Sequence, residues 1–283
     1  MARVSNCKIG TRPDGHRQRR QRLVVNILMA LCCFGLSASS AQAAKPAWQF
    51  SAGVAAQTTP LYQGSDQQEL YLLPAISAVR HWGEHGRFFA GSLEGVGVET
   101  TWSLLAMGAA VGYRYGLAGA DSLGLWRDAP DILQGMTDPG ATATLKPYLT
   151  TLFPKWNARL EYEQGLASDN EGAVLSLQLS ANLITQQSWS WQSGVQASWA
   201  NDRYMDTYFS VDAAETRADR RRFQAQSGVL HVGVFSRWQY QPQPQRLWQF
   251  SVALKQLGDA ISQSDLVSDQ QQIEFGLVYL WLF

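Results

Sequence analysis

Histidines are the side chains best suited to chemistry in this 283-residue chain, and HWGEH (His81–His85) comes nearest to a catalytic motif. Its spacing matches the zinc pattern H-x-x-E-H, in which a helix places both histidines on one face. Here Gly83 lies inside the motif, Gly86 follows it, and strand-like segments flank it. The segment is therefore interpreted as a tight turn, and we expect no metal ion or other cofactor.

A hydrolase would need a serine or aspartate beside a histidine near one end of the fold. After the first 43 residues the histidines are His81, His85 and His231. The first two belong to the turn, and His231 lies inside a strand-like segment on the same face as Arg237. The sequence offers no nucleophile for any of them, so we predict that the protein is not an enzyme.

Two charged segments lie between the strand-like segments. Asp121–Asp138 is rich in acids but lacks the alternating oxygen ligands of a calcium loop, so it is interpreted as a solvated loop. RADRRR (Arg217–Arg222) is the basic cluster of the later chain. On an outer loop it would either bind lipopolysaccharide phosphates through charge-assisted hydrogen bonds or remain solvated.

The first 43 residues have the pattern of a cleaved secretory signal peptide. A cationic stretch (His16–Arg22) precedes about fourteen mostly apolar residues (Leu23–Leu36), and AQA (Ala41–Ala43) fits the cleavage site. We expect cleavage after Ala43, which leaves residues 44–283 as one domain. The three cysteines all lie in the leader: Cys7, Cys32 and Cys33. The exported domain must therefore be stable without a disulfide.

Charge changes sign at the predicted cleavage site. The leader holds seven Lys and Arg residues and one acid, whereas the whole chain holds 23 of each sign. Residues 44–283 therefore carry 16 basic and 22 acidic side chains, a net charge of −6. Since phosphate recognition needs a basic face, nucleic acid is not an expected partner.

Segment after segment of the later chain alternates apolar and polar residues with a period of two. The alternating segments are 48–56, 142–153, 156–163, 173–183, 188–199 and 248–257. Successive side chains of a strand point to opposite faces, so each segment is a strand that is apolar on one side. A soluble sandwich would bury the apolar faces against each other, and a transmembrane barrel would turn them to lipid.

Three features favour an all-β, closed antiparallel transmembrane barrel. The segments are about 9–13 residues long, as tilted membrane-spanning strands are. Aromatic residues stand at segment ends, as in the girdles of such barrels: Trp48, Trp82, Trp156, Trp189, Trp199, Trp238, Tyr240, Trp248, Trp281 and Phe283. A closed sheet also has no edge and satisfies its backbone without water.

The chain ends on a stripe of alternating large apolar residues. Phe275, Leu277, Tyr279, Trp281 and Phe283 share one face of the last segment. This ending resembles the signal that the barrel-assembly machinery of the bacterial outer membrane reads. In the alternative sandwich, the same stripe would be buried core.

Length predicts about twelve strands, because barrels of this class use even numbers and roughly 20 residues per strand and connection; ten is the alternative. The expected strands are 48–58, 69–80, 87–98, 101–115, 142–153, 156–164, 172–184, 187–200, 205–212, 228–241, 246–257 and 272–283. This assignment puts the long segment 116–141 on the periplasmic side, where turns are usually short. Either an early strand is miscounted or that connection is atypical.

The inward face of the predicted barrel carries charges of both signs. The expected lumen residues are Arg114, Lys146, Arg159, Glu161, Glu163, Arg237, Lys255 and Glu274. Such a set either lines a water-filled pore or cross-links a filled interior.

Two stretches resemble the MipA/OmpV family, whose name means MltA-interacting protein. Leu61–Arg80 contains a tyrosine–glycine–serine–aspartate loop and then a strand with a proline within it, and Asn201–Glu215 contains the Asp-x-Tyr and Tyr-Phe motifs. The residues that carry the resemblance are Tyr62, Gly64, Ser65, Asp66, Pro74, Asp202, Tyr204, Tyr208 and Phe209.

The resemblance implies an outer-membrane barrel that acts as a scaffold, holding a murein transglycosylase near a murein synthase. Its expected partners are outer-membrane lipid and lipopolysaccharide, the barrel-assembly machinery and that transglycosylase. A small-solute channel is the alternative function.

Overall fold

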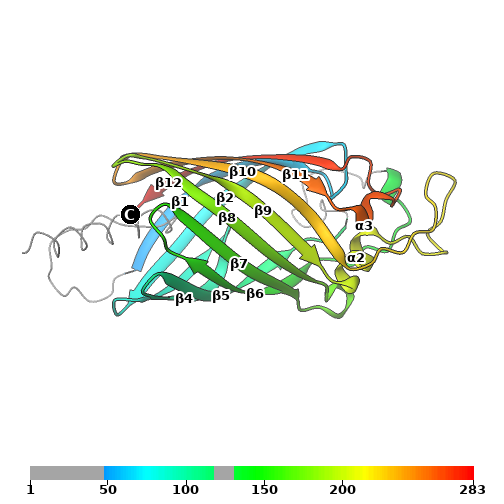
Figure 1. Cartoon of the computed structure of the whole chain (residues 1–283), viewed down its shortest axis with the longest axis horizontal. Helices are drawn as coiled ribbons and strands as arrows, with labels where there is room; N and C mark the ends of the chain where they lie inside the picture. Colours follow the sequence, from blue (N-terminus) through cyan, green and yellow to red (C-terminus); the bar gives the residue numbers. More distant parts are fainter. Residues whose placement is uncertain (1–47, 118–130) are drawn as a thin grey trace, which may run out of the picture.

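The computed structural model describes residues 48–117 and 131–283, and these form a closed antiparallel barrel of twelve strands (Figure 1). The strands are β1 (Trp48–Pro60), β2 (Gln68–Trp82), β3 (Gly86–Gly91), β4 (Gly95–Trp102), β5 (Leu105–Arg114), β6 (Thr142–Thr151), β7 (Trp156–Gly165), β8 (Ala173–Thr185), β9 (Trp189–Ala200), β10 (Gly228–Gln243), β11 (Arg246–Leu257) and β12 (Gln271–Leu282). Short helices α2 (Asp202–Phe209), α3 (Asp259–Ser262), η2 (Asp131–Leu133) and η3 (Ser168–Asn170) lie in the connections. None of the described helices is long and apolar enough to cross a membrane. The predicted barrel and its twelve strands are confirmed.

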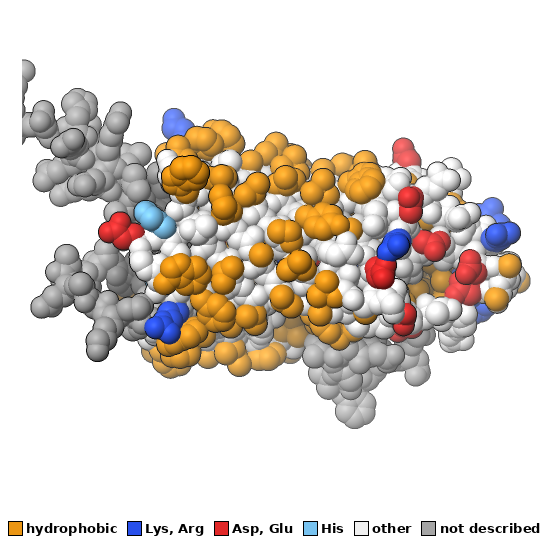
Figure 2. Space-filling model, turned by 90° about the horizontal axis from the view of Figure 1, so that it is seen from below, with side chains coloured by type: hydrophobic (Ala, Val, Ile, Leu, Met, Phe, Trp, Pro, Cys, Tyr) orange, Lys and Arg blue, Asp and Glu red, His pale blue; other side chains and the backbone are white. Residues whose placement is uncertain are grey.

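Because apolar and polar residues alternate along the strands, the barrel wall has the expected apolar outer face. On β2, Leu70, Leu72 and Ile76 are 58–66% exposed, whereas Ala75 and Val79 are buried. Figure 2 shows the hydrophobic side chains covering the middle of the barrel, with charged groups gathered toward its two ends. An apolar outer band of this kind is what the hydrocarbon region of a membrane requires.

The last strand closes the barrel against the first. β12 pairs with β1 from Ser51↔Leu282 to Thr58↔Phe275, and the Phe283 N–H donates to the Phe50 carbonyl at 2.9 Å. Every strand therefore has two neighbours, and both chain termini of the barrel lie at one end (Figure 1).

The connections between strands differ in length at the two ends of the barrel. The five connections at the end with the termini span only two to four residues: 83–85, 103–104, 152–155, 186–188 and 244–245. The longest connections, 115–141, 201–227 and 258–270, are all at the opposite end. Short turns mark the periplasmic side of bacterial barrels, so we expect the long loops to face outward from the cell. We call these the turn end and the loop end.

Two strand assignments made from the sequence are wrong, and their errors cancel in the count. The expected strand 87–98 is the hairpin β3–β4, which turns at Ser92–Glu94 and continues from Gly95 with a φ of +84°. The expected strand 205–212 falls largely on helix α2. Because there is one more strand before residue 115 than the sequence predicted, the connection 115–141 lies at the loop end and not at the turn end.

Helix α2 forms because a capping residue precedes residues spaced with a helical period. The Asn201 side chain accepts a hydrogen bond from the Tyr204 N–H at 3.0 Å, which satisfies one of the free donors of the first turn. Tyr204, Met205, Tyr208 and Phe209 are all buried, at the i, i+1, i+4 and i+5 positions of one face.

Candidate functional site

Residues of the tyrosine–glycine–serine–aspartate loop tie the β1–β2 connection to the loop before β12. Gly64 has a φ of +98°, and a Cβ at this position would lie 3.0 Å from the Val267 Cα. Its carbonyl accepts hydrogen bonds from the Ser268 and Asp269 N–H groups at 2.7 and 2.9 Å. Ser65 adds a second link, since its carbonyl accepts from Gln272 Nε2 at 3.3 Å. This glycine is required by both its backbone angle and the close approach of the second loop.

The Asp-x-Tyr and Tyr-Phe residues lie on α2 and connect it to the end of its own loop and to two other loops. Asp202 Oδ1 accepts from the Ser227 N–H at 2.6 Å. The Tyr204 hydroxyl donates to Gln63 Oε1 at 3.1 Å, and the Tyr208 hydroxyl donates to the Tyr115 carbonyl at 2.9 Å. The family motifs, far apart in sequence, therefore meet at the loop end.

Apolar side chains from these loops form one cluster, which we call the plug. Its buried members are Leu61, Tyr62, Leu117, Leu133, Ala200, Tyr204, Met205, Tyr208, Phe209, Val211, Ala225, Leu230, Leu257, Ile261 and Leu266. They come from the connections 61–67, 115–141, 201–227 and 258–270 and from adjoining strand ends. Four of the six connections at the loop end therefore meet in one apolar cluster.

Arginines of the basic cluster hold the plug together. Arg220 is 1% exposed, and its guanidinium donates to the carbonyls of Glu215, Ile132 and Gln134. Arg217 Nη1 donates to the Asp131 and Gln134 carbonyls, each at 3.1 Å. The basic cluster is therefore not simply a solvated loop, because two of its arginines hydrogen-bond to the backbone of the neighbouring connection.

Two further arginines of the cluster remain on the surface. Arg221 pairs with Asp265 at 2.8 Å, although its own side chain is 80% exposed. Hydrogen bonds from Arg221 lower the pKa of Asp265 to about 2. Arg222 is exposed. Binding of lipopolysaccharide by this surface stays a prediction.

Burial also keeps the plug tyrosines neutral. It raises the pKa of Tyr62, Tyr204 and Tyr208 above the ordinary value for a phenol. Their hydroxyls therefore remain hydrogen-bond donors throughout the physiological range.

Charged residues cross-link the lumen below the plug. Arg114 pairs with Glu163 at 2.8 Å, and Lys146 reaches the same carboxylate at 3.2 Å. Arg159 pairs with Glu161 at 2.6 Å. Lys255 and Glu274 form a third group at 2.6 Å. Seven of the eight residues expected in the lumen thus stand in ion pairs between or along its strands.

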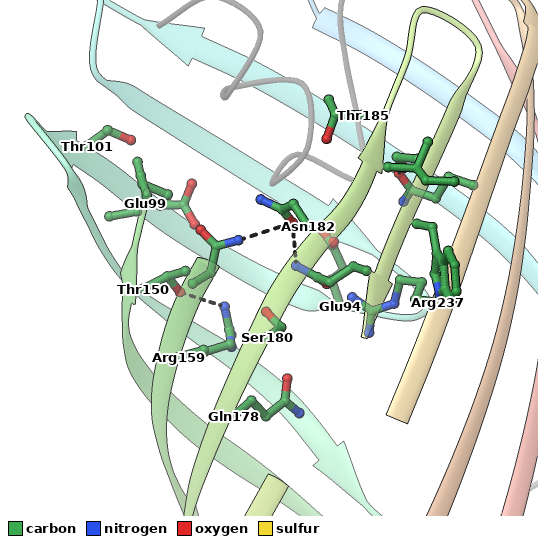
Figure 3. A pocket seen from close by; sticks show the side chains of 18 of the residues that line it. Glu94, Glu99, Thr101, Thr150, Arg159, Gln178, Ser180, Asn182, Thr185 and Arg237 are labelled. Carbon is green, nitrogen blue, oxygen red and sulfur yellow. Dashed lines mark hydrogen bonds between the residues drawn. The ribbon is translucent and has the colours of Figure 1, made fainter. Parts of the chain in front are cut away.

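Arg237 is the remaining residue of that set, and it lines a cavity of about 320 Å³ in the turn half of the lumen. Figure 3 shows this cavity, with Arg237 on one wall and Glu99, Thr150 and Arg159 on the other. The lining also includes Gln178, Ser180, Asn182, Ser190 and Gln239. Both charge signs and many amides and hydroxyls face this space, which therefore suits water and polar solutes.

The strongest pair at this cavity was missed from the sequence. Arg87 and Glu99 form a two-point ion pair at 2.8 and 3.2 Å, and both side chains are nearly buried. The Tyr148 hydroxyl donates to the same carboxylate at 2.8 Å, and the Arg159 guanidinium lies 3.9 Å from the Tyr148 ring centroid. A turn signal between Gly91 and Gly95 would have split the expected strand and put both charges on the lumen face.

Histidines do not assemble a reaction centre among the described residues. His85 lies in the turn 83–85, which confirms a turn within the predicted segment, but His81 belongs to strand β2. His231 lies 3.3 Å from the Ser198 hydroxyl, but no carboxylate in residues 48–117 or 131–283 hydrogen-bonds its ring. The same residues contain no group of three potential metal ligands.

The terminal stripe points away from the lumen. Phe275, Leu277 and Trp281 are 37–44% exposed on β12, and Phe283 beyond the strand is 76% exposed. Pro74 likewise faces outward from β2. Recognition of the stripe by assembly machinery stays a prediction, and the expected signal peptide and residues Asp121 and Asp128 of the acid-rich segment lie outside the described residues.

Comparisons with solved structures return other outer-membrane barrels. One is the COG4313 outer membrane channel from Pseudomonas putida F1, with 12% identity, 88% of this chain and 100% of that chain covered, and a TM-score of 0.44. Another is the translocator domain of the autotransporter NalP from Neisseria meningitidis, with 8% identity, 95% of each chain covered, and a TM-score of 0.43.

A search of curated proteins gave no match. The family model "MltA-interacting protein MipA" matches residues 52–283, which include all twelve strands apart from the first four residues of β1. The chain therefore belongs to the MipA family of outer-membrane β-barrel proteins.

Proposed function

We propose that this protein is a closed outer-membrane scaffold, which holds a murein transglycosylase at the turn end of its barrel. The observation that carries the proposal is the plug, because fifteen buried apolar residues fill the loop end. A barrel filled in this way is poorly suited to free diffusion. The family description, which refers to interaction with MltA, favours a protein partner.

A partner in the periplasm would meet the turn end. That surface carries the stacked aromatic residues Phe153 and Trp156 in the turn that also holds Lys155, and Glu84 is exposed in the turn between β2 and β3. Aromatic groups surrounded by charges are suited to protein recognition. The scaffold needs no reaction of its own.

The test is capture of a purified murein transglycosylase by the barrel in lipid nanodiscs. We expect binding that falls at least fivefold when Glu84→Lys and Lys155→Glu are combined at the turn end. The matched control is Arg222→Glu at the loop end, which leaves binding unchanged. Equal binding by all three proteins, or none by the unaltered barrel, would refute the scaffold.

The second candidate is a small-solute channel, which is favoured by the polar cavity and its charges of both signs. Planar-bilayer recording separates the two. A scaffold gives little conductance. A channel gives steady conductance whose ion selectivity changes with Arg159→Glu or Lys255→Glu.

A further inference from the structure

Two arginines stand on the lipid-facing side of the barrel wall near the turn end. Arg80 lies two residues before the end of β2 and points to the same side as Leu72 and Ile76 of that strand. Arg246 begins β11 and points to the same side as Phe250. Both arginine side chains are exposed. They therefore face the boundary between the apolar band and water rather than the lumen.

Aromatic rings surround Arg80. Its partners across the sheet are Trp48 on β1 and Phe88 on β3. The guanidinium carbon lies 5.8 Å from the Trp48 ring centroid, and the Trp48 and Phe88 rings meet edge to face with their centroids 5.6 Å apart. A cation is attracted to the face of an aromatic ring, so this contact orients the guanidinium.

Arg246 has a similar arrangement on the other side of the seam between β1 and β12. It pairs across the sheet with Trp281, and its guanidinium carbon lies 5.2 Å from that ring centroid. Two residues further along β11, Trp248 contacts Tyr279 with ring centroids 4.5 Å apart. We call Arg80 with Trp48, and Arg246 with Trp281, the arginine–tryptophan pairs. Such aromatic rings gather at the level of the lipid headgroups, so we expect both arginines at that level.

The two arginines lack the protein counter-ions that exposed arginines at the loop end have. Arg217 and Arg221 each form an ion pair with an aspartate. Within residues 48–117 and 131–283, no carboxylate forms an ion pair with Arg80 or Arg246. Their charge is therefore available to an anion from outside the chain.

The charge of the two ends favours an anion at the turn end. In the described connections of the loop end, acidic residues outnumber basic ones. The five turns of the other end contain one acidic residue, Glu84, and one lysine, Lys155, in addition to the two nearby arginines. Figure 2 shows acidic groups concentrated at the loop end and basic groups beside the apolar band at the turn end. Basic residues at a membrane surface attract anionic lipids.

The two arginine–tryptophan pairs are separated along and across the sheet. Through the paired strands, Arg246 is level with Trp281 on β12 and with Ile76 on β2. Arg80 lies four residues further along β2, about 13 Å, and β2 is three inter-strand spacings from β11, about 14 Å. The two backbone positions are therefore about 19 Å apart. We expect each pair to hold a headgroup of its own.

We propose that each arginine–tryptophan pair binds the phosphate of one anionic phospholipid of the phosphatidylglycerol class, in the periplasmic leaflet. The planar guanidinium donates parallel hydrogen bonds to two phosphate oxygens, and the tryptophan ring contacts the glycerol and the first acyl carbons. Phosphatidylethanolamine offers the same phosphate, but its ammonium group adds a positive charge beside the arginine. The sites therefore prefer the anionic lipid.

The experiment is native mass spectrometry of the purified protein, released from nanodiscs that hold equal amounts of phosphatidylglycerol and phosphatidylethanolamine. We expect up to two retained phosphatidylglycerol molecules per barrel, with an occupancy at least fivefold above that of phosphatidylethanolamine. Equal retention of the two lipids by the unaltered protein would overturn the proposal, whatever the variants do. The measurement contains no protein partner, so its outcome is independent of the scaffold.

Removal of the guanidinium groups tests the two pairs directly. Arg80→Gln combined with Arg246→Gln removes both charges, and we expect retention of phosphatidylglycerol to fall at least fivefold. Each single variant should lose one of the two bound lipids. The matched control is Arg222→Gln, which removes an exposed arginine at the loop end and should leave retention unchanged.

Every variant must still shift between unboiled and boiled samples on a gel, which shows that its barrel is folded. Undiminished retention in the folded double variant would mean that phosphatidylglycerol binds elsewhere on the barrel, and the proposal would then be wrong. An equal loss in Arg222→Gln would also contradict it, because the lipid would then respond to total charge and not to the arginine–tryptophan pairs.

Discussion

The two halves of the lumen are filled by different physical means. The loop end is packed with apolar side chains and with arginines bonded to carbonyls, whereas ion pairs and a polar cavity occupy the lumen between this cluster and the turn end. Apolar packing excludes water, but a charged lattice tolerates it. We therefore expect the plug to be the barrier to solutes, and the turn half of the lumen to be accessible to water.

Arg220→Ala should have the largest effect on the difference between the two parts of the lumen. The change removes a buried guanidinium and leaves the carbonyls of Glu215, Ile132 and Gln134 without their donor. Truncating a buried charged group of this kind costs about 3–5 kcal/mol, here in the local stability of the plug. We expect ion conductance in planar bilayers to rise well above that of the unaltered protein.

The control for this change is Arg222→Ala, which removes an exposed arginine of the same cluster and should leave conductance low. If the folded Arg220→Ala protein conducts no more ions than the control does, the plug is not the barrier to ions.

Glu99→Gln tests the ion pairs in the turn half of the lumen. The amide keeps one hydrogen bond to Tyr148 but loses the two-point pair with Arg87. We expect the free energy of unfolding in urea to fall by about 1–3 kcal/mol, without a gain in conductance. Glu84→Gln in the turn is the matched control and should have no effect. A conductance gain as large as that of Arg220→Ala would show that both halves block the lumen.

Gly64→Ala should produce a smaller and local effect at the loop end. Alanine is strained at a φ of +98°, and its Cβ would press on the Val267 Cα. We expect a local loss of about 1–2 kcal/mol. Hydrogen exchange of the Ser268 and Asp269 amides, which donate to the Gly64 carbonyl, reports it directly. Gly135→Ala, with a φ of +77° but open space around it, separates backbone strain from the lost contact.

These regions also differ in how far the sequence predicts them. The wall follows from a local rule, since period-two alternation specifies which side chains face lipid and which face the lumen. That rule placed Arg159, Glu161 and Lys255 on the lumen face. It fails at Arg87 and Glu99, because period-two alternation does not detect the turn between β3 and β4.

The plug could not be derived from such a rule. Arg220 is surrounded by acids and arginines in sequence, and only distant carbonyls make it a buried residue. Helix α2 was missed for a different reason. Its cap at Asn201 and its helical period were both readable, but they were outweighed by an expectation of strands throughout.

The smallest effect concerns the surface pair Arg221–Asp265, which joins the 201–227 and 258–270 connections outside the plug. The folded pKa of Asp265 is lowered to about 2, below its ordinary value of 3.8. A lowered carboxyl pKa contributes stability above the unfolded value, and that contribution is lost as pH falls through the folded one. Loop proteolysis by pepsin should therefore increase between pH 4 and pH 2.

Asp265→Asn removes the titrating group and should make that proteolysis less dependent on pH. Because the Arg221 side chain is 80% exposed, the change should be slight and should weaken further in high salt. The acceptors of the Arg220 guanidinium are backbone carbonyls rather than carboxylates, so we expect the plug itself to remain closed to ions at pH 2. Conductance that appears on acidification would instead mean that the surface pair, rather than the buried arginine, keeps the loop end shut.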